Sequence, residues 1–412
     1  MKFLRLSNQF LIIASLFVSV PIFSAVQVIK PSENSYQEIQ EALILAKPGD
    51  IIRLSAGVFT LEDSLSLDVA GVQIEGEGMS QTILDFSNQL SGAQGLSVTS
   101  DNVTLQDFAI QNAKGDAIKV KGVTNIKFLR VKTEWTNGPS SDNGAYGLYP
   151  VESKNVLIDG CVAIGASDAG IYVGQSQNII VRNSRAEFNV AGIEIENSYF
   201  ADVYNNVATN NTGGILVFDL PGLPQQGGHH VRVFKNRSVG NNTDNFAPEG
   251  NIVGEVPRGT GIIIQANSDV EIFDNEIGDN DTVNIAVVTY GNDTDDQAYY
   301  PHPKSVQIHG NKFGPTGYNP DTSKGELAQI LFDLSGGNMP DIFWDGLLPL
   351  SQLVFGQPEN EKMIITNNGD ATMLAIKPFG YMLPFLEPAI LDITKFDGEI
   401  TPLEKVEFDE TF

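Results

Sequence analysis

Apolar and polar residues alternate along most of the chain in short runs, the period expected of β-strands with one buried face. The runs form a recurring phrase: a polar residue, alternating apolar positions, an Asn/Gly turn, and then Gly-Ile-x-Val. The clearest copies begin at Asn155, Asn178 and Asp202, and fainter ones at Asn102, Asn125, His230, Asp269 and Ser305. The first strands open at Val103, Ile126, Val156, Ile179, Val203, Val231, Val270 and Val306, at spacings of 23, 30, 23, 24, 28, 39 and 36 residues.

These spacings predict the fold. A single copy cannot bury its apolar face alone, so successive copies have to stack. Coils of 23 residues or more that each hold several short strands predict an all-β, right-handed parallel β-helix. In this solenoid the strands of successive coils pair in parallel, about 4.8 Å apart. Residues in excess of a coil are expected to leave as loops, which often gather on a binding face.

The start of the chain has the features of an export signal, assigned to residues 1–25. Lys2 and Arg5 precede an apolar run over 10–20, and Ala25 offers a small residue for cleavage. The apolar run is too short for a transmembrane helix. We therefore expect a periplasmic or secreted protein.

The rest of the chain divides into three parts. Residues 26–50 are expected to form an N-terminal cap, in which an amphipathic helix over 36–46 covers the open edge of the first coil. The parallel β-helix is assigned to 51–341. Residues 342–412 lose the repeat and are rich in Pro, so we expect an irregular C-terminal cap or an extension along the solenoid.

The charge of the chain excludes some partners. Its 412 residues include 51 Asp and Glu but 25 Lys and Arg, a net charge of −26. Removal of the export signal leaves 23 basic and 51 acidic residues, a balance of −28. Such a field repels nucleic acid and anionic lipid, so neither is expected as a partner. The single cysteine, Cys161, excludes a disulfide framework. The sequence does not indicate an oligomeric state.

The Gly-Ile-x-Val strands predict a binding face. Side chains alternate across a strand, so the residues between the inward apolar positions point outward. The first outward file is Lys119, Tyr149, Tyr172, Glu194, Leu216 and Ile263, and the second is Lys121, Val151, Gly174, Glu196, Phe218 and Gln265. Aromatic rings, lysines and acids in files suit a sugar-binding groove, with the loops 133–145 and 219–230 as its walls. A stacked tyrosine ladder and charges that merely face solvent are the alternative interpretation.

Glu194 and Glu196 are the candidate catalytic residues. They lie two apart on one strand, so their backbones are about 6.6 Å apart on the same side. Paired carboxyls in inverting glycoside hydrolysis are about 6.5–9.5 Å apart. Adjacent like charges separate the two pKa values, which suits one acid and one base. An exposed acidic pair without a function is the alternative.

Lys119, Lys121, Tyr149, Tyr172 and His229 are the candidate substrate-binding residues. Lysines bind carboxylates, and His229, at the end of a long loop, suits proton transfer near neutral pH. His230 is instead expected to be a turn residue, because it falls in a column that precedes each first strand. That column is Asn102, Asn125, Asn155, Asn178, Asp202, His230, Asp269 and Ser305.

The segments IQEALILAKPGDIIRLSAGVF and GVQIEGEGMSQTILDF, followed by the stacked Gly-Ile-x-Val coils, resemble exported pectin-lyase-like β-helix proteins. The resemblance covers about residues 35–340. Within that superfamily the chain is most similar to exported bacterial parallel β-helix repeat proteins, an uncharacterised family. The superfamily contains lyases, hydrolases, epimerases and phage tailspikes, so the resemblance implies a fold and leaves the function open.

A more distant similarity is to the mannuronan C5-epimerases. Their signature, Tyr-Gly-x-Asp-Pro-His-Asp/Glu, supplies a catalytic Asp and His. The corresponding segment here, residues 146–152, reads YGLYPVE. Tyr149 stands where that family has the Asp and Val151 where it has the His. The chain therefore resembles this family in the other residues of the motif but lacks its two proton-transfer groups.

No cofactor is expected. With one cysteine and four histidines, motifs for zinc, haem and nucleotides are missing. Ca²⁺ is left open, because acids crowd loop-like segments at Asp244, Asp279, Asp281, Asp293, Asp295 and Asp296. Solvated loop charge is the alternative.

Two functions remain for the predicted groove. The first is a polysaccharide-active enzyme, either a uronan epimerase or lyase or a glycan hydrolase that uses the glutamate pair. The second is a non-catalytic protein that presents this face to a glycan or to another exported protein.

Overall fold

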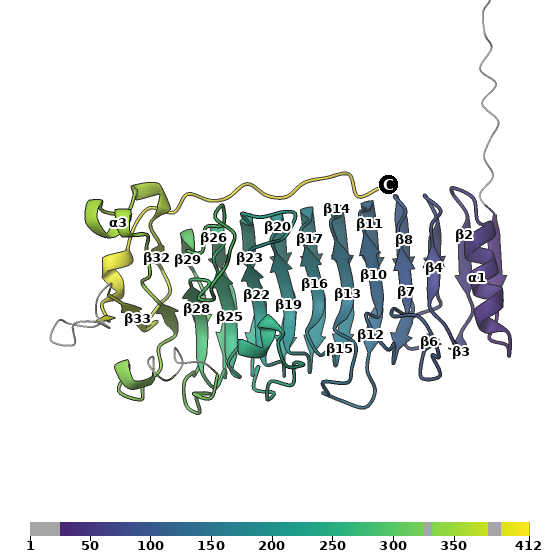
Figure 1. Cartoon of the computed structure of the whole chain (residues 1–412), viewed down its shortest axis with the longest axis horizontal. Helices are drawn as coiled ribbons and strands as arrows, with labels where there is room; N and C mark the ends of the chain where they lie inside the picture. Colours follow the sequence, from purple (N-terminus) through teal and green to yellow (C-terminus); the bar gives the residue numbers. More distant parts are fainter. Residues whose placement is uncertain (1–24, 325–328, 330–331, 378–388, 412) are drawn as a thin grey trace, which may run out of the picture.

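The computed structural model describes residues 25–324, 329, 332–377 and 389–411. The export signal assigned to residues 1–25 therefore lies outside the described residues, except for Ala25. The described chain forms the predicted right-handed parallel β-helix, with three long sheets that run along its axis (Figure 1). No helix among the described residues is both long and apolar enough to cross a membrane.

We call the three faces sheets A, B and C. Sheet A consists of β1 (Val26–Ile29), β2 (Ile51–Leu54), β5 (Gln73–Glu75), β8 (Val103–Gln106), β11 (Thr124–Leu129), β14 (Lys154–Asp159), β17 (Gln177–Arg182), β20 (Tyr199–Tyr204), β23 (His229–Phe234), β26 (Ser268–Phe273), β29 (Lys304–His309) and β32 (Ile364–Thr366). Sheet B consists of β3 (Gly57–Thr60), β6 (Thr82–Asp85), β9 (Ala109–Gln111), β12 (Lys132–Glu134), β15 (Val162–Ile164), β18 (Arg185–Glu187), β21 (Val207–Thr209), β24 (Arg237–Val239), β27 (Glu276–Gly278) and β30 (Lys312–Phe313). Sheet C consists of β4 (Leu65–Leu67), β7 (Leu96–Val98), β10 (Ile118–Lys121), β13 (Tyr146–Val151), β16 (Ala169–Gly174), β19 (Ala191–Glu196), β22 (Gly213–Phe218), β25 (Thr260–Gln265), β28 (Val283–Val288), β31 (Ile342–Trp344), β33 (Met373–Ile376) and β34 (Ala389–Ile390). Each coil visits B, C and A in turn.

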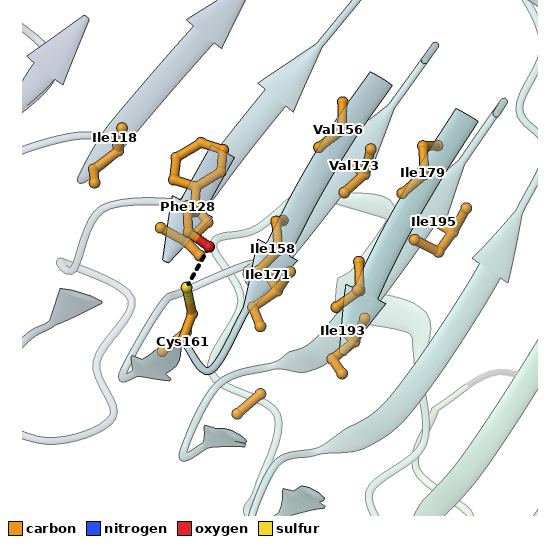
Figure 2. Packing of buried hydrophobic residues seen from close by; sticks show 14 of the residues in the cluster. Ile118, Phe128, Val156, Ile158, Cys161, Ile171, Val173, Ile179, Ile193 and Ile195 are labelled. Carbon is orange, nitrogen blue, oxygen red and sulfur yellow. Dashed lines mark hydrogen bonds between the residues drawn. The ribbon is translucent and has the colours of Figure 1, made fainter. Parts of the chain in front are cut away.

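The lumen of the solenoid is filled by the inward apolar residues of the three sheets. Ile171, Ile193 and Ile215 are register partners in successive strands of sheet C and stack in one file. Figure 2 shows such files from two sheets facing each other, with the buried Cys161 thiol 3.4 Å from the carbonyl oxygen of Phe128. Each fully buried aliphatic side chain contributes about 1.5–3 kcal/mol of transfer free energy. The repeated apolar file is therefore the main stabilising feature of the stack.

Buried asparagines close the turns between sheets. Asn206, Asn236, Asn275, Asn311 and Asn368 form one ladder, in which each side-chain oxygen accepts hydrogen bonds from the previous member's backbone and side-chain N–H. A second ladder links Asn189, Asn211, Asn241 and Asn280. Since buried backbone groups need partners, each ladder stabilises the coil-to-coil stacking.

The predicted column of turn residues is present in the structure, except that one of its members is a different residue. His230 has a left-handed backbone with φ 57°, as a turn residue should, and so do most other members. Asp202 does not belong to the column, because Ile179 is the register partner of Ala201 rather than of Val203. Phe200, with φ 58°, holds the turn position. The strand therefore opens two residues earlier than expected, because Ala201 was not counted as an apolar position.

The two ends of the solenoid differ in kind. Helix α1 (Ser35–Leu45) packs against the first coil, and strand β1 precedes it within sheet A. At the other end the sheets extend beyond residue 341, through β31, β32 and β33. The repeat fails to mark these last coils because long insertions separate their strands. These insertions include α3 (Leu350–Phe355) and the short 3-10 helix η2 (Glu359–Glu361); another, η3 (Ile393–Phe396), follows the last strand.

The last residues form an extended tail, which we define as residues 399–411. The tail runs back along the outer face of sheet A toward the middle of the solenoid (Figure 1). Thr401 exchanges backbone hydrogen bonds with the Gln307 side chain, and Glu410 forms a bidentate ion pair with Arg182. Val406 packs with Leu157 and Ile180.

Candidate functional site

The outward files of sheet C exist in the register that the sequence suggests. Lys119 is the partner of Tyr149, Tyr172 of Glu194, and Glu194 of Leu216. Tyr172 and Leu216, with Tyr149 packed against them, belong to a hydrophobic cluster outside the lumen, separate from the main core. The central residues of these files are nevertheless buried rather than solvent-exposed: Tyr172 is 4% exposed, Glu194 2% and Glu196 8%.

Loops and aromatic rings cover these files. The loop 241–259, which contains the short 3-10 helix η1 (Ile252–Glu255), folds over sheet C so that Val253 and Val256 join its outer cluster. Asn251 of this loop donates a hydrogen bond of 3.3 Å to Oδ2 of Asp168. The polar files therefore lie beneath a folded cover.

Three tyrosines from two neighbouring coils form part of that cover. The rings of Tyr146 and Tyr149 stack with centroids 4.3 Å apart, and Tyr172 lies 4.7 and 5.0 Å from them. Such aromatic contacts are favourable beyond the area they bury, by about 0.5–1.5 kcal/mol each. The cluster gives the site a stable aromatic wall beside its acids.

Three carboxyl groups meet under this cover: Asp168, Glu194 and Glu196. Burial, with the neighbouring acids, raises the pKa of Asp168 to about 7. Burial raises the pKa of Glu196 to about 7, and Asp219 adds to the shift, while a hydrogen bond from the Tyr172 hydroxyl opposes it. Burial raises the pKa of Glu194 well above its ordinary value, and the charges of the other two acids add to this effect. Protons are therefore shared within this group near neutral pH.

One atom of this cluster is conspicuous. Oε2 of Glu194 is buried and has no hydrogen-bond partner among the described residues. Buried polar atoms in folded proteins are nearly always paired, and titratable groups in perturbed surroundings are concentrated at functional sites.

Asp168 was not among the residues singled out from the sequence. It precedes the first residue of β16, so the alignment of outward positions within strands does not include it. The signal that identifies it is the burial of an acid directly before a Gly-Ile strand, to which Asn251 of the loop 241–259 contributes a hydrogen bond.

The two lysines are present on this face, but each is paired. The Lys119 Nζ lies 3.7 Å from Oδ2 of Asp116 and 4.9 Å from the centre of the Tyr149 ring. The Lys121 Nζ lies 3.2 Å from Oε1 of Glu152. Neither is therefore an uncommitted cation for a sugar carboxylate.

His229 is not brought together with the glutamates. It opens β23 in sheet A, around the corner from sheet C, and stacks on Tyr199 with centroids 4.4 Å apart. Its Nδ1 lies 2.9 Å from Nδ1 of His230. Burial lowers the pKa of His229, and a protonated His230 would lower it further. This arrangement favours a neutral ring in an aromatic stack.

The predicted walls stand at the two edges of sheet C. The loop 133–145 enters β13, and the loop 219–230 leaves β22, where Asp219 accepts hydrogen bonds from the backbone N–H groups of Gly227 and Gly228. Burial raises the pKa of Asp219 to about 6. The outer face of sheet C is thus flanked by loops on both sides.

Three of the acids considered for Ca²⁺, Asp244, Asp281 and Asp296, have protein partners. Asp281 lies 3.3 Å from Nε of Arg258, and Asp244 pairs with the same guanidinium at 2.8 Å. Asp296 accepts hydrogen bonds from the loop 219–230. Within residues 25–324, 329, 332–377 and 389–411, no group of three His, Cys, Asp or Glu is arranged to hold a metal ion.

Comparison with known proteins agrees with this architecture. The family model described as a right-handed β-helix region matches residues 70–222. The family model and the three parallel sheets together show a right-handed parallel β-helix fold. No curated protein matches the sequence.

Several solved structures share this fold at low sequence identity. The A-module of the mannuronan C-5 epimerase AlgE4 of Azotobacter vinelandii superposes with a TM-score of 0.50 and 15% identity, over 84% of this chain and 92% of that one. The tailspike protein of the E. coli bacteriophage HK620, in complex with a pentasaccharide, gives a TM-score of 0.52 and 12% identity over 85% and 62%. The N-terminal fragment of gene product 12 of bacteriophage phi29 gives 0.51 and 13% over 81% and 59%. At such identities the likeness concerns the fold alone.

Proposed function

We propose that the outer face of sheet C is the active site of a glycan hydrolase that acts on a largely uncharged polysaccharide. The proposal is carried by the carboxyl group of Glu194: it is buried, its pKa is raised well above the ordinary value, and one of its oxygens lacks a partner among the described residues. A neutral carboxyl donates a proton, so Glu194 is the general acid that protonates the departing glycosidic oxygen.

Glu196 takes the complementary role of general base. Its pKa of about 7 leaves part of the population ionised near neutrality, and Tyr172 stabilises that ionised form by a 2.7 Å hydrogen bond. Two positions along one strand separate the backbones of the two glutamates by about 6.6 Å. A separation of this size suits inverting hydrolysis, in which the two carboxyl groups are far enough apart for an attacking water to lie between them.

The charges favour an uncharged substrate over a uronan. Lys119 and Lys121 are both paired with acids, and Asp168 adds a third carboxyl to the site. The chain carries a large negative balance, which repels polyanions. Tyr149 and Val151 also replace the Asp and His of the epimerase signature. The epimerase and lyase alternatives therefore have less support than hydrolysis.

Polysaccharide as the substrate class fits two solved proteins of the same fold. One is a mannuronan epimerase module and the other was solved with a bound pentasaccharide. An exported location, as the segment 1–25 suggests, fits a polysaccharide substrate.

Binding without turnover is the second candidate, and one observation favours it. Tyr172 and Glu194 are almost completely buried, so a substrate reaches them only when the cover over sheet C opens. A protein that only presents its face to a glycan does not need that opening.

Incubation of the purified protein with neutral and acidic glycans separates these functions. Release of reducing ends, with the anomeric configuration of the product followed by NMR, reports hydrolysis, and absorbance of unsaturated uronate reports a lyase. We expect reducing ends from an uncharged glycan with inversion. Binding of glycans without any product would support the second candidate and remove the first.

A further inference from the structure

A cavity lies on the same outer face of sheet C, one coil beyond the glutamates. Its volume is about 510 Å³. Its floor is made by outward residues of four consecutive strands, β22, β25, β28 and β31: Phe218, Ile263, Gln265, Ala286, Val288 and Phe343. Because Glu196 is the register partner of Phe218, the cavity adjoins the acid cluster directly. A chain bound across the glutamates along the solenoid axis therefore places its next unit over this cavity.

Loops from both edges of sheet C enclose the cavity. Residues 252–257 of the cover loop form one wall, and residues 289–292 form the other. Its volume falls within the range of small-molecule binding sites, about 300–1,000 Å³. The charged residues among those that line it are Glu255 and Lys324, one of each sign. The cavity therefore suits an uncharged group.

Gln265 is the one polar residue of the floor, and polar side chains also line the rest of the cavity: Thr260, Thr282, Thr289, Tyr290 and Asn292. Ile263, Ala286 and Val288 present aliphatic carbon, which offers nothing to a sugar hydroxyl. Oε1 of Gln265 is buried and lacks a hydrogen-bond partner among the described residues. A ligand that fits both features has to bring one hydrogen-bond donor together with an apolar group.

We propose that this cavity binds the acylamino group of an N-acylated amino sugar, so that the substrate is a glycan containing such units. The amide N–H donates to Oε1 of Gln265, and the acyl methyl packs on Ile263 and Val288. A sugar with hydroxyl groups only would place polar atoms against the aliphatic floor. An ester-linked acyl chain has no N–H, so it would leave the Gln265 oxygen unpaired. The link to a glycan rests on the proposed function.

Saturation-transfer NMR with simple methyl glycosides tests this proposal independently of turnover. The probes are the methyl glycosides of N-acetylglucosamine, N-acetylgalactosamine and N-acetylmannosamine, compared with those of glucose, galactose and mannose. At least one N-acetyl sugar is expected to bind tenfold or more tightly than its hydroxyl counterpart, with the strongest saturation at the acetyl methyl. Equal binding within every pair, or no binding by any probe, would overturn the proposal.

Two variants locate the binding. Gln265→Leu removes the acceptor and Ala286→Phe fills the floor, and each is expected to abolish the preference for the N-acetyl sugar. Gln175→Leu is the matched control, because its Oε1 is also buried and unpaired but lies outside the cavity. Circular dichroism and thermal melting verify that each variant folds. A preference that survives in both folded cavity variants would contradict the proposal.

Failure of this proposal and failure of hydrolysis are distinguishable. Acetyl-selective binding without any turnover would keep the cavity assignment and remove the hydrolase. Hydrolysis of glycans without N-acyl groups at the same kcat/KM as acylated ones would keep the hydrolase and remove the cavity assignment.

Discussion

Tyr172 donates its hydroxyl hydrogen bond to Oε1 of Glu196 in the next coil, at 2.7 Å. The register partner of Glu196 is Gly174, two residues along the strand from Tyr172, so the ring lies diagonally across that glycine. A Cβ on Gly174 would come within 2.1 Å of the Tyr172 hydroxyl oxygen. The missing side chain at position 174 is therefore what permits the contact between the two coils.

Removal of the Tyr172 hydroxyl is expected to change the pH dependence of activity. Its hydrogen bond lowers the pKa of Glu196, so Tyr172→Phe should raise that pKa above about 7. If Glu196 is the base, the acidic limb of the profile of kcat/KM against pH moves to higher pH. The lost hydrogen bond should also cost about 1 kcal/mol of stability. Tyr149→Phe removes a hydroxyl from the same cluster but no bond to Glu196, and an equal displacement there would contradict the assignment.

Gly174→Ala is expected to displace the Tyr172 ring, because the new methyl group occupies the place of its hydroxyl. The variant should reproduce the pH displacement of Tyr172→Phe and lose about 1–3 kcal/mol of stability, as overpacked sites do. The profile of kcat/KM against pH and thermal melting measure the two effects. A wild-type pH profile in a folded Gly174→Ala protein would show that the contact does not set the pKa of Glu196.

Glu194→Gln and Glu196→Gln should each reduce kcat by about 100-fold or more, because each removes a proton-transfer group. Binding of the glycan, measured by calorimetry, should remain. Glu187→Gln is the control, since Glu187 lies on sheet B and pairs with Arg185. Wild-type kcat in both glutamate variants would refute the catalytic assignment while leaving glycan binding open.

The buried acids predict a loss of stability as the pH rises. A carboxyl group whose folded pKa is raised binds more protons in the folded than in the unfolded state, so stability falls with pH between the two pKa values. For Glu196 the interval runs from its ordinary 4.5 to about 7. The pKa of Glu194 is raised as well, so the same sign applies.

This effect is measurable as a difference between two proteins. Glutamine resembles the neutral acid and does not titrate, so Glu194→Gln and the wild type should be about equally stable below pH 4.5. Near pH 8 the variant should be the more stable of the two proteins, because only the wild type has to ionise this buried carboxyl group or keep it protonated against the pH. Thermal or denaturant unfolding across pH checks the sign. A variant that is less stable than the wild type at high pH would show that Glu194 is ionised and stabilised in the folded protein.

Loss of one ladder asparagine should destabilise the stack. The Asn236 amide donates to the carbonyl oxygen of Val203 and to Oδ1 of Asn275, and its own oxygen accepts from Asn206. Asn236→Ala leaves several buried groups unpaired, so we expect a loss of about 2–3 kcal/mol, measured by denaturant unfolding. Asn125→Ala removes a member of an exposed ladder and should cost less. Equal costs would mean that the buried ladder has no special role.

The fold was predictable because its evidence is local and repeated. Alternating apolar positions and the Gly-Ile-x-Val phrase determine which side chains enter the lumen, and neighbours in every coil confirm the choice. The one error in the predicted register arose at Ala201, because this small residue weakens the apolar pattern. The last coils, around Ile342 and Met373, were missed because long insertions separate their strands.

The site was predictable only in part. The alignment of strands placed Tyr172, Glu194 and Glu196 on one outward face, and the structure has them there. Their burial and the contribution of Asp168 depend in part on where the loop 241–259 folds, and no repeat specifies that. Lys119 instead pairs locally, with Asp116 three residues earlier. His229 lies at the start of β23 in sheet A, a position relative to the glutamates that the length of its loop does not specify.

The tail along sheet A has a consequence for how this molecule unfolds. A solenoid in which coils contact only their neighbours can fray from its ends, one coil at a time. Here Glu410 is bonded to Arg182, 228 residues earlier in the chain, and Leu403 to Glu271, 132 residues earlier. Unfolding of the final coils would therefore strain the contacts of the tail and affect the central coils that the tail binds. The closing segment thus makes the solenoid more cooperative than its one-dimensional architecture alone would allow.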